Sequence, residues 1–231
     1  MTTILALDTA TNACSAAFWD DGKITARRFE LMPRGHAERL VPMISEVTNE
    51  AGRAAKDVDL IAVTVGPGAF TGMRVGLATA RALALAAGVP CLGLTSLEVI
   101  AAGVGDTAGR LIVGLDSKRA DLFVQVFDGS GRAMSEAAAV MPAALATWVS
   151  PYFMATQSLT AAGDAAADVV ALLSEAGTAC APADVPYPDA AVLAQVAAVR
   201  WSPGDVVPRP APLYLRPPDA VVPVNGGRLR P

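Results

Sequence analysis

The segment "VGPGAFTGMRVGLATARALALAAG", Val65 to Gly88, decides how this chain is interpreted. Gly66, Gly68 and Gly72 precede an Ala- and Leu-rich run of high helix propensity. Glycines let a backbone approach a partner closely, and a helix N-terminus offers unpaired N–H groups and a positive dipole end. The segment lacks the Lys-Ser/Thr pair of a P-loop, and Arg74 is the only cation near the glycine loop. It predicts either a degenerate phosphate loop or a structural strand-to-helix turn.

The neighbouring pattern predicts an α/β fold. Residues 59–65 have the composition of a buried strand, and the helix after the loop covers about residues 71–87, ending at Gly88. Upstream, alternation predicts strands near 4–8, 15–19 and 23–30, with a hairpin turn at "DDG", 20–22. A second helix is expected over "HAERLVPMISEVTNEAG", which ends at Gly52.

The first strand and turn recur later in the chain at a constant offset of 108 residues. The matched pairs are Leu7 with Leu115, Asp8 with Asp116, Thr9 with Ser117, and Asp20 with Asp128. Chance similarity between short strands is the alternative. Because the turns match as well as the strands, we expect a duplicated unit and two related lobes.

Composition restricts the classes of function. The 231 residues are 53% hydrophobic, with a net charge of −4 and a pI of about 5.0, which argues against strong direct binding of nucleic acid. No uncharged apolar run reaches the ~18 residues of a membrane helix, and the start does not read as a signal peptide. We therefore expect a cytoplasmic protein. The three cysteines lack metal-ligand spacing and are expected to be structural thiols.

Polar candidates cluster at the end of the first strand. Asp8 and Thr9 occupy a tight turn whose groups could face a phosphate; the alternative is that they cap their own backbone. His36, the only histidine, lies at a helix start, where a capping or surface role is more common than metal binding.

The two predicted helices, over residues 36–52 and 71–87, are both unusually apolar, which predicts a surface covered by another subunit. Burial in the chain's own core is the alternative. The candidate interface residues are Leu40, Met43, Ile44 and Val47 on the first helix, and Leu77, Ala80 and Ala84 on the second.

Four segments together resemble the TsaB (YeaZ) family, the dimerization subunit of the bacterial machinery for threonylcarbamoyladenosine at tRNA position 37. They are "LALDTATNACSAAFWDDGK", "HAERLVPMI", "VTVGPGAFTGMRVGLATARALA" and "PLYLR". The resemblance covers residues 3 to about 216. It implies an actin-like ATPase (ASKHA / RNase H-like) α/β fold, with lobes at 1–108 and 109–216 and an irregular tail at 217–231.

The resemblance also implies a non-catalytic scaffold subunit. It would pair with TsaD, join TsaE in a ternary complex, and form a homodimer when alone. It would contact tRNA only through that complex, and it would not contact a membrane. No cofactor of its own is implied; ATP and a metal ion are expected in TsaD.

Metal-binding relatives carry a motif of the form Asn-His-x-x-x-x-His after the glycine loop and helix. The corresponding stretch here is "LTSLEVIAA", which places Ser96 and Ile100 at the two histidine positions. Serine is a poor ligand and isoleucine is none, so loss of the metal chemistry is expected. A glycoprotease-like peptidase and a small-molecule kinase of the same fold are the rival interpretations.

Overall fold

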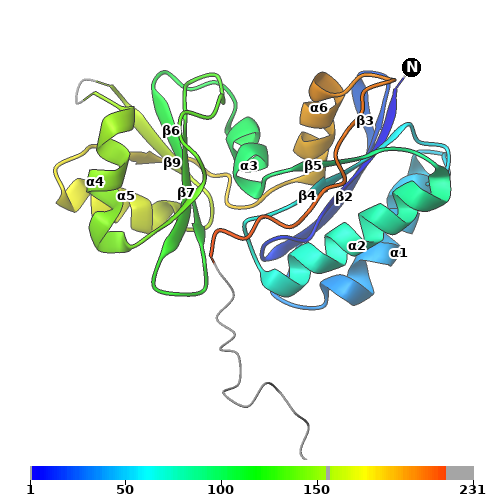
Figure 1. Ribbon diagram of the computed structural model, residues 1–231, viewed down its shortest axis with the longest axis horizontal. Coiled ribbons are helices and arrows are strands. Elements are labelled where there is room, and N and C mark those ends of the chain that lie inside the picture. The colour runs from blue at the N-terminus through cyan, green and yellow to red at the C-terminus, as the bar shows by residue number, and fades with distance from the viewer. Residues whose placement is uncertain (1, 155–156, 217–231) are drawn as a thin grey trace, which may run out of the picture.

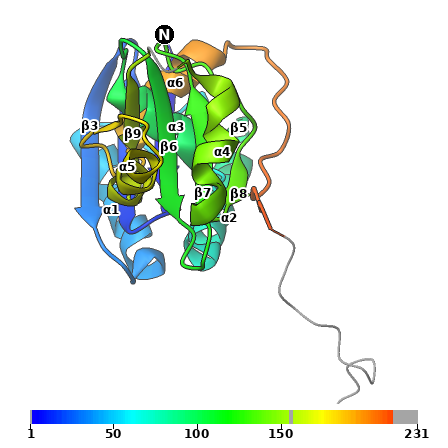
Figure 2. The same cartoon turned by 90° about the vertical axis from the view of Figure 1, so that its left-hand side faces the viewer.

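The computed structural model describes residues 2–154 and 157–216, which form two lobes that stand side by side (Figure 1). The predicted tail at 217–231 lies outside the described residues. Figure 2 shows the molecule from the side of the second lobe, so the sheet of the second lobe lies in front of the first lobe.

The first lobe is built on a five-stranded sheet in the order β3-β2-β1-β4-β5. The antiparallel β1–β2–β3 meander turns at Asp21 and Gly22, whose φ angles of 42° and 97° suit the tight hairpin that the sequence predicts. β4 and β5 run parallel to β1. The strands are β1 (Thr3–Asp8), β2 (Ala13–Asp20), β3 (Lys23–Leu31), β4 (Leu60–Thr64) and β5 (Cys91–Leu94).

Helices cover both faces of this sheet. Strand side chains alternate between the faces, so Leu5 and Leu7 pack under α1 (His36–Glu50) and α2 (Phe70–Ala87). Ile4 and Ala6 pack on the other face under α6 (Ala190–Arg200). The predicted helix end at Gly88 is confirmed, because Gly88 adopts the left-handed conformation with φ 69°.

The second lobe repeats the first. Its sheet has the order β10-β9-β6-β7-β8. As in the first lobe, the first strand of the lobe is central, with two successive antiparallel strands on one side (β7 and β8) and two parallel strands on the other (β9 and β10). Asp8 ends β1 and Asp116 ends β6, so the predicted duplication and its two matched aspartates are confirmed. The strands are β6 (Arg110–Asp116), β7 (Leu122–Phe127), β8 (Ala138–Val140), β9 (Leu159–Ala162) and β10 (Ala181–Pro182).

Short helical segments complete the second lobe, and one helix connects the two lobes. α4 (Leu145–Val149), between 3-10 turns at Pro142–Ala144 and Ser150–Tyr152, shares the core with α5 (Ala166–Glu175). α3 (Ser96–Val104) lies between the lobes, with Leu97 and Ile100 packed against the second sheet.

The lobes are not contiguous in the sequence, which corrects the predicted boundary of the second lobe at 109–216. α6 buries Leu193 and Ala197 against the first sheet. Residues 207–216, here called the C-terminal strap, run beside α2 and β5, and the Leu213 N–H donates to the Val65 carbonyl at 2.8 Å. The first lobe therefore takes its last helix from the far end of the chain.

Candidate functional site

The candidate site lies where the turn after β1 meets the glycine loop and the start of α2. Asp8 is fully buried at the end of β1. One carboxylate oxygen, Oδ1, accepts hydrogen bonds from the Thr64 hydroxyl and from the Ala10 N–H at 3.2 Å. The second oxygen, Oδ2, has no partner within the described residues. Burial raises the Asp8 pKa to about 7, although its two hydrogen bonds oppose the shift.

The glycines of the loop touch the chain itself. A Cβ on Gly68 would lie 2.0 Å from the Ala10 carbonyl oxygen, and one on Gly72 would lie 2.1 Å from that of Thr9. Gly66 has a φ of 97°, and a Cβ there would meet the Met73 sulfur at 2.2 Å. Close backbone contact therefore accounts for Gly68 and Gly72, and the positive φ together with the Met73 side chain accounts for Gly66, without a ligand.

Two hydrogen bonds hold the same surfaces together. The Thr9 hydroxyl donates to the Gly72 carbonyl at 2.7 Å, and the Ala69 N–H donates to the Ala10 carbonyl at 2.7 Å. Thr9 is 1% exposed, so its hydroxyl is used inside the protein. This arrangement is the structural strand-to-helix turn that the sequence left open as an alternative.

Arg74, the cation of the predicted phosphate loop, is engaged beside the loop. Its guanidinium carbon lies 3.7 Å from the centroid of the Phe70 ring, and its Nε donates to the Tyr214 hydroxyl at 2.9 Å. The Phe70 and Tyr214 rings stack at 5.7 Å. Arg74 thus fastens the C-terminal strap to α2.

A cavity of about 350 Å³ separates the turn and loop from the second lobe. Thr11, Asn12 and Thr71 line one side, and Asp116, Lys118 and Asp164 line the other. The Lys118 Nζ lies 2.8 Å from Asp116, and this pairing outweighs the effect of burial and lowers the Asp116 pKa. Burial raises the pKa of Asp164. The lysine is neutralised by its own neighbour, so the cavity offers little free positive charge.

His36 and the cysteines have structural positions. The His36 Nε2 lies 3.0 Å from the Thr11 carbonyl and 3.2 Å from that of Ala13, which ties the start of α1 to the first hairpin. Burial raises the pKa of Cys14 to about 12 and that of Cys91 and Cys180 to about 11, so the thiols stay protonated near neutral pH. No group of three or more metal-ligating side chains occurs within the described ranges.

Ser96 and Ile100, at the positions of the metal motif, are both completely buried at the start and middle of α3. The Ile100 side chain belongs to the core against the second sheet. The Ser96 hydroxyl has no partner in the part of the chain that the structure describes. The two positions therefore pack the interior between the lobes.

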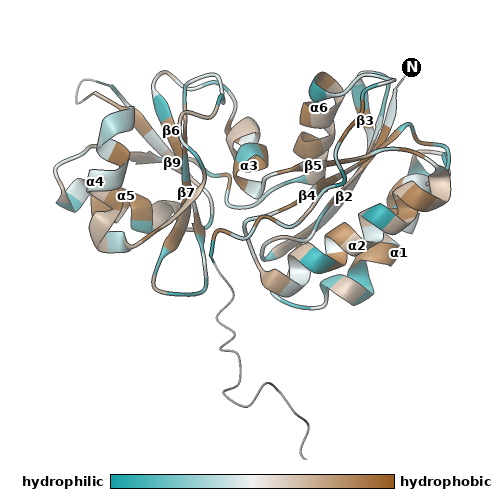
Figure 3. Ribbon diagram, viewed as in Figure 1, coloured by the Kyte–Doolittle hydropathy of each residue, from teal (hydrophilic) through white to brown (hydrophobic). Residues whose placement is uncertain are grey.

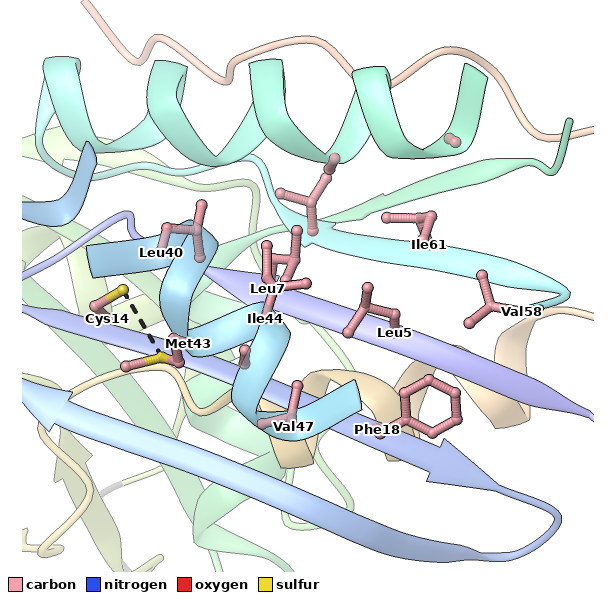
Figure 4. Close-up of a cluster of buried hydrophobic side chains, with 14 of the residues drawn as sticks. Leu5, Leu7, Cys14, Phe18, Leu40, Met43, Ile44, Val47, Val58 and Ile61 are labelled. Atoms are coloured by element: carbon pink, nitrogen blue, oxygen red, sulfur yellow. Dashed lines mark hydrogen bonds between the residues drawn. The ribbon is translucent and has the colours of Figure 1, made fainter. Parts of the chain in front are cut away.

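The predicted interface residues are misplaced. All seven are buried in the chain's own core, with Leu40, Met43, Val47 and Ala80 at 0% exposure and Ile44 the most exposed at 6%. Figure 4 shows the side chains of α1 directed toward Leu5, Leu7 and Phe18 of the sheet. The prediction is wrong because the strands of the first lobe supply the covering surface. The corrected residues are Leu40, Met43, Ile44, Val47, Leu77, Ala80 and Ala84.

The opposite faces of the same helices are exposed and carry few charges. On α1, Ala37, Val41 and Ser45 follow one another at four-residue spacing. On α2, Ala78 and Ala82 are exposed, and Leu85 is 85% exposed. In Figure 3 much of the α2 ribbon is brown or white, interrupted by teal bands. We call these six residues the outer helix face.

Sequence reasoning missed the role of the C-terminal strap. Arg216 bonds to the Ser117 hydroxyl at 2.8 Å and pairs with the Asp121 carboxylate, so the strap reaches the second lobe. The motif "PLYLR" signalled a resemblance, but its prolines predicted only an irregular tail. Its contacts are all distant in sequence, which is why the pattern did not indicate them.

Comparison with known proteins identifies relatives of this chain. The family model described as TsaD, tRNA N6-adenosine threonylcarbamoyltransferase, matches residues 30–185. The Escherichia coli protein named tRNA threonylcarbamoyladenosine biosynthesis protein TsaB is 39% identical over 122 residues. That match covers 52% of this chain and 52% of the relative, so it spans about half the length of each. An uncharacterised Mycobacterium bovis protein is 34% identical over 95% of this chain and 94% of its own length.

The same similarity is seen in solved structures. A Pseudomonas aeruginosa protein, described as uncharacterised with similarity to peptidase YEAZ, superposes with a TM-score of 0.80 at 30% identity. The match covers 94% of this chain and 100% of that one. Among the described residues, no helix is long and apolar enough to cross a membrane.

Proposed function

Because the chain belongs to the TsaB (YeaZ) family, with the actin-like ATPase fold, we propose that it is a non-catalytic subunit in the biosynthesis of threonylcarbamoyladenosine in tRNA. Its partner is TsaD, which modifies adenosine 37 in tRNAs that read codons starting with A. TsaE joins the pair in a ternary complex. We place this work in the cytoplasm.

The observation that carries the proposal is the outer helix face. Its small side chains, Ala37, Ser45, Ala78 and Ala82, permit a second pair of helices to approach closely. Val41, at 57% exposure, and Leu85, at 85%, add apolar area. A subunit of the same fold has an equivalent helix pair to offer, so TsaD is the partner and a second copy of the chain takes its place when TsaD is absent.

The candidate site supports a non-catalytic role. The loop is closed onto the turn at Thr9 and Ala10, and Arg74 is occupied by the strap. We assign ATP and the metal ion to TsaD as part of this proposal. The net charge of −4 favours contact with tRNA through the complex rather than by this chain alone.

The test is reconstitution from purified subunits. The chain is mixed with TsaD, TsaE, tRNA, ATP and an activated threonylcarbamoyl donor, and transfer of the threonylcarbamoyl group to tRNA is measured with each protein omitted in turn. We expect transfer to fall to background without this chain, and the isolated chain neither to hydrolyse ATP nor to cleave glycoprotein. Metal-dependent turnover by the isolated chain, lost on substitution of Asp8 or Arg74, would favour the enzymatic interpretation.

A further inference from the structure

A second cavity, of about 370 Å³, lies beside the C-terminal half of α2. Its walls come from three separate parts of the first lobe: the helix, the start of β5, and the C-terminal strap at Val207–Pro210. The lining residues are Arg81, Ala84, Leu85, Val89, Cys91, Val207, Arg209 and Pro210. We call it the strap cavity.

The strap cavity is positively charged in a protein of net charge −4. Arg81 donates from Nη2 to the Pro210 carbonyl, but its buried Nε has no hydrogen-bond partner within the described residues. Arg209 is exposed and forms no ion pair within the same described ranges. No carboxylate lines the cavity, and Cys91 is neutral because burial raises its pKa to about 11. Two arginines therefore share one apolar hollow without a counter-ion.

The nearby end of α2 does not supply that counter-charge. A helix C-terminus carries a partial negative charge on its last carbonyl groups. Here the Ala84 carbonyl accepts from the Val89 N–H at 3.0 Å and the Leu85 carbonyl from the Gly88 N–H at 3.4 Å. Both carbonyls are thereby engaged by the turn that ends the helix.

We propose that the strap cavity receives a carboxylate side chain from the protein that packs on the outer helix face. This inference rests on the proposed function, because it assigns a contact to the same partner. Leu85 connects the two surfaces, since it belongs to the outer helix face and also lines the cavity. A carboxylate held between Arg81 and Arg209 pairs with and neutralises both guanidinium groups. Leu85 provides an apolar contact beside that ion pair.

Arg209→Glu is the first test, because Arg209 is exposed and its replacement leaves the core intact. The dissociation constant of the complex with purified TsaD is measured by calorimetry at low and high salt. We expect the dissociation constant to rise about tenfold or more at low salt, with a weaker salt dependence. Arg132→Glu, an exposed arginine of the second lobe, is the matched control for net charge and should leave the constant unchanged.

Ala78→Arg separates failure of this inference from failure of the proposed function. If Ala78→Arg abolishes the complex while Arg209→Glu binds like the unmodified chain, the cavity proposal is wrong and the outer helix face stands. If the unmodified chain forms no complex with TsaD, the proposed function fails.

A partner-free measurement then decides the cavity proposal by itself. Sodium acetate is titrated into the isolated chain while the Arg Nε–H signals are followed by NMR. We expect the Arg81 signal to shift with acetate and not with acetamide, and Arg209→Gln to weaken the shift. An Arg81 signal that ignores acetate overturns the proposal.

Discussion

Replacing Gly72 by alanine distinguishes a loop that packs on its own chain from one that is open to a ligand. In an unobstructed helix interior, Gly→Ala stabilises by about 1 kcal/mol. Here the added Cβ would lie 2.1 Å from the Thr9 carbonyl oxygen, and the obstructing atom is backbone. Relief requires the turn and α2 to separate by about 1 Å, which strains the bond from the Thr9 hydroxyl to the Gly72 carbonyl. Forcing extra atoms into a packed interior typically costs about 1–3 kcal/mol.

We therefore expect Gly72→Ala to lower the free energy of unfolding by about 2 kcal/mol, seen as a lower urea midpoint by circular dichroism. The melting temperature should fall by about 4–8 °C, given 2–4 °C per kcal/mol for a chain of this size. Gly103→Ala in α3 is the matched control, because its Cβ meets only side-chain methyl groups, those of Val185 and Val192 at 3.2 and 3.8 Å, and no backbone atom. A Gly72→Ala protein as stable as the unmodified chain, or more stable, would refute the packing argument.

Three further predictions follow from burial and pairing. Ala80→Arg should destabilise the fold by several kcal/mol, because Ala80 is 0% exposed, whereas the exposed Ala78→Arg variant should stay folded but no longer bind TsaD. Circular dichroism measures folding and a TsaD pull-down measures binding. A folded Ala80→Arg protein would contradict the first expectation. The pKa of Asp8 is raised to about 7, so the native state keeps this proton while the unfolded state loses it, and the free energy of unfolding falls as pH rises from about 4 to about 7. Asp8→Asn should remove this dependence, which is up to about 1.4 kcal/mol per pH unit in the free energy measured by urea unfolding. Parallel pH profiles of the two proteins would contradict this. Arg216→Ala should increase amide exchange in the strap near Leu213 without unfolding either lobe, since it removes the ion pair with Asp121; unchanged exchange would show that this ion pair does not hold the strap.

Much of the fold could be predicted from local pattern. Alternation marks β1, a continuous apolar run marks the buried strand β4, the "DDG" turn marks the hairpin between β2 and β3, and Gly88 marks the end of α2. The offset of 108 predicts the second copy of the strand order. These features depend on residues close together in the chain, where steric limits and side-chain periodicity act directly.

Sequence periodicity could not say what covers an apolar stripe. It correctly groups Leu40, Ile44 and Val47 on one side of α1, but a partner subunit and the chain's own sheet produce the same pattern. Only tertiary structure decides between them, because β1, β2 and β4 bring Leu5, Phe18 and Ile61 beneath the helix from distant positions. The return of α6 to the first sheet escaped prediction for the same reason.

The glycine loop shows where the sequence stops deciding. By itself the sequence determines that Gly66, Gly68 and Gly72 leave the backbone bare just before a helix. It does not determine what fills the bare space, since a phosphate and a carbonyl oxygen both need room near the backbone. Tertiary structure gives the space at Gly68 and Gly72 to the Ala10 and Thr9 carbonyls, because pairing of β1 with β4 brings the two following turns against each other.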